Sequence, residues 1–121
     1  MSLPQPPDWL PLPWVLLGTA AVLEVVWALA LKESQGFTRP WPGVLAVGAA
    51  AVSFLLLSLA LRDLPVGTGY AVWVGLGAVG VALAGMTLLG ESADPWRIGF
   101  LVLILVGVAG LHVAEARVPH P

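Results

Sequence analysis

The stretch WVLLGTAAVLEVVWALAL, residues 14–31, carries a single charged side chain, Glu24, among eighteen residues. An α-helix needs about 20 mostly apolar residues to cross the hydrocarbon core of a bilayer. Similar stretches follow at 42–61, 66–89 and 96–113. Of the 121 residues, 59% are hydrophobic and only 10% are charged, which is unlike a water-soluble domain. The sequence therefore predicts an all-α integral membrane protein whose four transmembrane helices lie in a lipid bilayer.

The segments outside the four apolar stretches are too short to form further domains. Prolines crowd the N-terminal segment, where they disfavour a helix. Charged and turn-forming residues gather between the apolar stretches, and the alternation typical of a β-barrel strand is absent. We expect a proline-rich lead at 1–13, a four-helix transmembrane domain at 14–113 and a C-terminal tail at 114–121. We place the chain in the cell inner (plasma) membrane as a multi-pass protein.

Several classes of function lack the residues that they require. The chain has no basic patch for a nucleic acid and no cysteine for disulfides or thiol chemistry. His112 and His120 stand apart from any acidic cluster, so we expect no metal site. No Ser-His-Asp set, glycine-rich phosphate loop or paired catalytic carboxylates are evident, so we expect neither an enzyme nor a cofactor.

Glu24 is the one ionisable side chain at the depth of the bilayer centre. A charge at that depth costs about 2.5–3.5 kcal/mol on insertion scales, so the carboxylate needs a proton, a bound cation or another polar group. A proton and a cation that compete for one carboxylate can exchange across the membrane, which is the logic of an antiporter. The structural alternative is a protonated glutamate that forms a hydrogen bond between helices.

Aromatic and hydroxyl side chains are predicted to surround this carboxylate. Trp27 lies one helical turn after Glu24 and shares its face. Ser53 is the mid-depth hydroxyl of the second span, and Tyr70 and Trp73 lie three residues apart in the third. Aromatic faces attract cations, so these residues together predict a site for a small organic cation. Taken singly, each aromatic is more often a packing or interfacial residue, and a serine often bonds its own helix.

Glycines suggest two further features of the helices. Gly75 and Gly77 could let the third span bend, although close helix packing explains them about as well. Gly99, Gly107 and Gly110 leave room for another helix to approach the fourth span, which we interpret as dimer packing. Four helices alone are too thin to enclose a shielded pathway, so we expect the chain to associate.

Positive charge is almost balanced between the two sides of the predicted bundle. Arg62 and Arg117 fall on one side, and Lys32, Arg39 and Arg97 fall on the other. Because loop Lys and Arg residues set orientation, a balance of two against three predicts insertion in both orientations.

The segments EVVWALALKESQGFTRPWP and LPVGTGYAVWVGLGAVG resemble the small multidrug resistance transporters. The likeness extends over nearly all of 14–113. It combines a lone glutamate in the first span, GFTR after that span, a proline at the start of the next helix and G-x-x-Y-A-x-W in the third. Trp27, three residues after Glu24, is similar to the guanidinium-exporter branch of this family, since the multidrug branch usually has a small residue there.

This resemblance implies an antiparallel homodimer of dual-topology subunits that exchange guanidinium-type cations for protons at one shared site. It makes Glu24 the coupling carboxylate, with Trp27, Ser53, Tyr70 and Trp73 lining or orienting it. Some members of the family work only as pairs of different chains, so a heterodimer stays open. A quaternary ammonium exporter and a non-transporting membrane scaffold are the alternative functions. We also expect the indole N–H of Trp27 to orient the carboxylate, because it is a hydrogen-bond donor.

Overall fold

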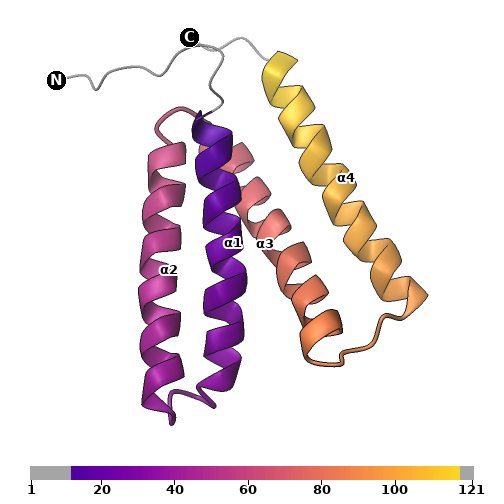
Figure 1. The fold of residues 1–121 in the computed structure, drawn as a ribbon. Helices are drawn as coiled ribbons and strands as arrows, with labels where there is room; N and C mark the ends of the chain where they lie inside the picture. The colour runs from indigo at the N-terminus through magenta and orange to yellow at the C-terminus, as the bar shows by residue number, and fades with distance from the viewer. Residues whose placement is uncertain (1–11, 118–121) are drawn as a thin grey trace, which may run out of the picture.

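The computed structural model describes residues 12–117, apart from the side chain of Ala116, and they form four helices joined by short loops (Figure 1). The helices are α1 (Leu12–Glu33), α2 (Pro40–Ala60), α3 (Val66–Leu88) and α4 (Pro95–Arg117). Each is long and apolar enough to cross a membrane. At a rise of 1.5 Å per residue they extend about 33 Å, which matches a hydrocarbon core of about 30 Å. The predicted all-α membrane fold with four spans is confirmed.

Prolines mark the beginnings of these helices. Pro40 and Pro95 are the first residues of α2 and α4, and Pro65 precedes α3. A proline is tolerated in the first helical turn because its missing N–H would have no partner there. Pro13 lies in the first turn of α1 for the same reason, so the helix begins two residues earlier than predicted.

The ends of the chain are only partly described. Of the predicted proline-rich lead, residues 1–11 lie outside the described residues, and so do residues 118–121 of the predicted tail. The described part of the tail continues α4 to Arg117. His120 therefore lies outside the described residues.

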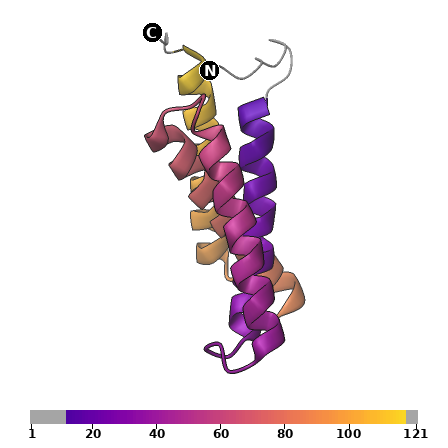
Figure 2. The same cartoon turned by 90° about the vertical axis from the view of Figure 1, so that its left-hand side faces the viewer.

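A tight turn reverses the chain between α1 and α2. Gln35, Gly36 and Phe37 all adopt positive φ angles, of 50°, 72° and 65°. The buried Ser34 holds this turn, because its Oγ accepts the Phe37 N–H at 3.1 Å and donates to the Leu31 carbonyl at 2.7 Å. As a result α2 returns antiparallel to α1, and both views show the two helices side by side (Figures 1 and 2).

Helix α1 packs mainly against α2 and also against α3, whereas α4 packs on α3, and α2 touches α3 only slightly (Figure 1). The buried core consists of residues from the first three helices, namely Leu17, Ala20, Leu57, Ala60, Val72 and Trp73. No residue in the apolar window of α4 is buried inside the subunit. The start of α1, the end of α4 and the 61–65 loop lie at one end of the bundle, as four spans require.

Two side-chain contacts fix the C-terminal half of α4. Thr68 Oγ1, in the first turn of α3, donates to Glu115 Oε1 at 3.0 Å. The ring of His112 meets the Trp14 ring of α1 nearly edge-on, with centroids 4.3 Å apart. These contacts attach α4 to the end of the bundle at which α1 and α3 begin.

Candidate functional site

The carboxyl group of Glu24 lies directly on the backbone of α3 at Gly77. A Cβ atom at Gly77 would overlap the carboxyl carbon and both carboxyl oxygens of Glu24. Among the described residues, Glu24 Oε1 is a buried atom without a hydrogen-bond partner. Because a buried polar atom without a partner is costly, this oxygen is suited to receive a proton or a cationic donor.

No basic side chain of the described residues lies in the spans at the depth of Glu24. The ion pairs of the described part are Arg39 with Glu33 and Arg97 with Glu91, and both lie at helix ends. The charge of Glu24 is therefore not neutralised from within these helices, and its neutralisation requires a proton or an external cation.

The indole of Trp27 lies one turn after Glu24 but does not bond to it. Its Nε1 is buried and has no hydrogen-bond partner among the described residues, so the expected bond to the Glu24 carboxylate is absent. The ring lies beside Phe54 of α2 instead, with centroids 6.4 Å apart. One turn of α1 thus carries an unpaired acceptor and an unpaired donor.

Ser53 and Trp73 form a buried chain of hydrogen bonds across three helices. Trp73 Nε1 donates to Ser53 Oγ at 3.1 Å, and Ser53 Oγ donates to the Ala20 carbonyl of α1 at 2.7 Å. Ser53 is fully buried, and its one hydroxyl proton is donated to that carbonyl. In an α-helix the same carbonyl accepts the N–H of Glu24, so Ser53 orients the turn that carries the carboxylate.

Aromatic rings form a continuous row from α1 to α3. The centroid of Phe54 lies 6.4 Å from that of Trp27 and 5.3 Å from that of Trp73, and the Tyr70 centroid lies 5.6 Å from that of Trp73. Trp73 is buried, whereas Tyr70 is 53% exposed within this subunit. Aromatic faces attract organic cations, most strongly where they are desolvated, as at Trp73.

Sequence reasoning missed Phe54 in this row. The residue stands between Ser53 and a run of leucines, and it is 51% exposed, so it resembles an ordinary lipid-facing side chain. Its position directly after Ser53 was the available signal, because it places the ring at the same depth as the site.

The glycines of α3 make close contacts with neighbouring helices. A Cβ at Gly75 would lie 2.7 Å from Val108 Cγ2 and 3.3 Å from Ile104 Cγ2, both on α4. Helix α3 is continuous through Gly75 and Gly77. Both glycines are therefore required for close packing in this conformation, and bending at these positions stays a prediction.

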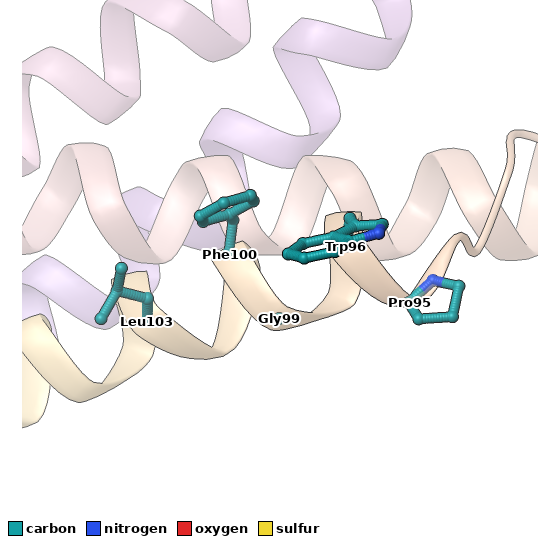
Figure 3. Close-up of a pocket in the computed structure, with 5 residues that line it drawn as sticks. All are labelled: Pro95, Trp96, Gly99, Phe100 and Leu103. Atoms are coloured by element: carbon teal, nitrogen blue, oxygen red, sulfur yellow. The ribbon is translucent and has the colours of Figure 1, made fainter.

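The outer side of α4 is open within the subunit. Nothing lies within 4 Å of a Cβ built at Gly99, Gly107 or Gly110, so their role in dimer packing stays a prediction. A hollow of about 500 Å³ on this helix is lined by Pro95, Trp96, Gly99, Phe100 and Leu103 (Figure 3). None of these five lining side chains is charged, so this hollow offers apolar surface only.

Within residues 12–117, no three histidine, aspartate or glutamate side chains lie together in a group that could hold a metal ion.

Comparison with known proteins gives consistent relatives. The family model described as Small Multidrug Resistance protein matches residues 12–104, from the start of α1 into α4. Proteins named guanidinium exporters from Escherichia coli (strain K12), Citrobacter freundii and Salmonella typhimurium are each 52% identical to this chain over 101 residues. The matches cover 84% of this chain and 96% of each relative. The relatives bear the names of exporters and not of enzymes.

Proposed function

Since the chain belongs to the Small Multidrug Resistance family of membrane transporters, we propose that it exports guanidinium or small guanidinyl cations in exchange for protons. Glu24 is the centre of this proposal. The observation that carries it is the buried, unpaired Glu24 Oε1, with no basic side chain of the described spans at its depth. The 52% identity to proteins named guanidinium exporters supports the choice of substrate.

The chemistry of guanidinium matches that of the carboxylate. Guanidinium is a flat cation whose parallel N–H groups can donate to both oxygens of a carboxylate. Binding would give Glu24 Oε1 a partner and would neutralise its charge. The Trp27 N–H is itself a donor, so Trp27 would contribute its ring face and not a hydrogen bond.

Exchange follows from competition at this one carboxylate. A bound guanidinium displaces the proton of Glu24, and a proton that arrives from the opposite side displaces the guanidinium. If the loaded site opens alternately to the two faces, the two fluxes are coupled, because the carboxylate holds one cation or the other. The proton is thus the coupling ion, and no further cofactor is needed.

The row of aromatic rings favours a second candidate substrate, a quaternary ammonium ion. Such an ion binds to aromatic faces without hydrogen bonds, so Trp27, Phe54, Trp73 and Tyr70 would suffice for it. It would leave Glu24 Oε1 without a hydrogen-bond partner, whereas guanidinium would not. We therefore place guanidinium first and quaternary ammonium second.

The working unit in this proposal is an antiparallel homodimer in the cell inner (plasma) membrane. Two observations support it. Helix α4 buries no residue of its apolar window within the subunit, and the Lys and Arg residues at the two ends of the bundle number two against three. A balanced chain inserts in both orientations, which supplies the two antiparallel partners. Gly99, Gly107 and Gly110 would lie at the contact.

Proton release on addition of guanidinium to the purified protein tests this function. In weakly buffered detergent solution, wild type should release protons in a saturable manner, whereas Glu24→Gln should release none, because an amide cannot exchange a proton for a cation. Gel filtration and circular dichroism would verify that the variant is inserted and folded. Tetraalkylammonium chloride, added in parallel, separates the two substrate classes. Absence of release from wild type, or guanidinium-coupled proton flux by Glu24→Gln in proteoliposomes, would refute the proposal.

A further inference from the structure

We infer that Gly77 is a positioning residue for Glu24, because only a residue without a side chain lets the carboxyl lie against the backbone of α3. The consequence for transport rests on the proposed function, whereas the contact itself does not. The inference assigns to Gly77 a role that differs from helix bending.

The contact at Gly77 differs from those of its neighbours on α3. Gly77 is buried, and a Cβ there would overlap the carboxyl carbon and both oxygens of Glu24. One turn further along the same interface, a Cβ at Gly80 would lie 2.7 Å from the Val25 Cγ2 methyl group. Both glycines thus allow close approach of α1 and α3, but only Gly77 does so for a polar group.

A methyl group at position 77 would have to displace the carboxyl. The Glu24 side chain has several rotatable bonds, so it could swing aside, but it would then leave its native position against the α3 backbone. A guanidinium ion donates two parallel hydrogen bonds to the two carboxyl oxygens. It would bind more weakly to a carboxyl that has moved or turned from its native position. A methyl at Gly80 would instead meet the Val25 Cγ2 methyl group, so it would strain apolar packing and would not touch the carboxyl directly.

Few titratable groups could obscure such an effect. Helix α2 has none between Pro40 and Ala60, and Tyr70 is the one titratable side chain of α3. The titratable or charged side chains described in α4 are Arg97 in its first turn and His112, Glu115 and Arg117 towards its end. On α1 itself, Lys32 and Glu33 lie in the last turn, about two turns from Glu24. A change in the pH dependence of guanidinium-linked proton release therefore reports on Glu24.

The first experiment compares Gly77→Ala with the matched control Gly80→Ala. Guanidinium affinity and the pH of half-maximal proton release are measured for both variants and for wild type. Gly77→Ala should weaken guanidinium binding about tenfold and shift the pH midpoint, as expected when one hydrogen bond to a charged group is lost. Gly80→Ala should change the affinity less than about twofold. Equal affinities and equal midpoints in the two variants would overturn the inference.

The second experiment measures the contact without any ligand. Thermal unfolding in detergent is compared for Gly77→Ala in the wild-type background and in a Glu24→Ala background. Gly77→Ala should lower the Tm in the wild-type background. It should not lower the Tm in the Glu24→Ala background, because that protein has no carboxyl at position 24 for the new methyl group to displace. Gly80→Ala should lower both Tm values equally. An equal penalty for Gly77→Ala in both backgrounds would overturn the inference.

The two experiments also separate the inference from the proposed function. If wild type releases no proton with guanidinium, the proposed function fails, and the unfolding comparison still decides the Gly77 contact. If the Gly77→Ala protein does not accumulate in the membrane, its yield is compared with that of the double variant Gly77→Ala, Glu24→Ala. A yield restored by the second substitution would support the contact, and an equally low yield would overturn it.

Discussion

Replacing Ser53 with alanine should weaken the packing of α1, α2 and α3 through the loss of two interhelical hydrogen bonds. These are the bonds from Trp73 Nε1 to Ser53 Oγ and from Ser53 Oγ to the Ala20 carbonyl. Interhelical hydrogen bonds in membranes contribute about 0.6 kcal/mol on average and at most about 1.7 kcal/mol. Trp73 is only 4% exposed, so its N–H would be left buried and unpaired. We therefore expect Ser53→Ala to lower the free energy of unfolding by about 2 kcal/mol.

Unfolding in mixed detergent micelles with increasing dodecyl sulfate would measure this loss. Ser58→Ala is the matched control, because Ser58 lies on the same helix but is exposed. A double-mutant cycle with Trp73→Phe, which removes the indole N–H, should give a coupling energy of about 0.6–1.7 kcal/mol. Guanidinium affinity should fall as well, since the turn that carries Glu24 loses its anchor.

Two results would refute this reasoning. If Ser53→Ala costs no more than Ser58→Ala, the hydrogen-bond chain does not stabilise the bundle. If the effects of Ser53→Ala and Trp73→Phe are additive, Trp73 and Ser53 do not interact energetically. Lower guanidinium affinity with unchanged stability would instead identify Ser53 as a direct ligand of the cation.

Two further predictions concern selectivity and orientation. Trp27→Gly should weaken guanidinium exchange more than it weakens binding of hydrophobic quaternary ammonium ions, because a bulky cation gains the volume of the indole. Transport currents for the two cations at matched protein yield give the ratio of the two activities. A ratio unchanged from wild type would leave Trp27 as a packing residue. The unmodified chain should insert in both orientations in about equal amounts, and two or three lysines added to the 61–65 loop should favour one. Labelling of single cysteines at the chain ends measures the two populations, and one fixed orientation in the unmodified chain would contradict the antiparallel dimer.

The four spans could be predicted from the sequence alone, and so could the position of Glu24 as the one ionisable side chain at the depth of the bilayer centre. A span is a local property, because each helix must be apolar over about 20 residues and must satisfy its own backbone hydrogen bonds. A carboxylate among such residues stands out without any knowledge of its neighbours. The family resemblance carried by Glu24, Trp27 and the third-span motif was likewise readable, and the match over residues 12–104 confirms it.

The partners of the site residues were decided only by the tertiary structure. A soluble helix reveals its buried face by an apolar stripe, but these helices are apolar on all sides, so their rotation about their own axes leaves little trace in the sequence. The structure turns Ser53 towards the Ala20 carbonyl, places Phe54 between two tryptophans and leaves the Trp27 N–H unpaired. It also sets the Glu24 carboxyl on Gly77, because helices approach closely where a side chain is missing.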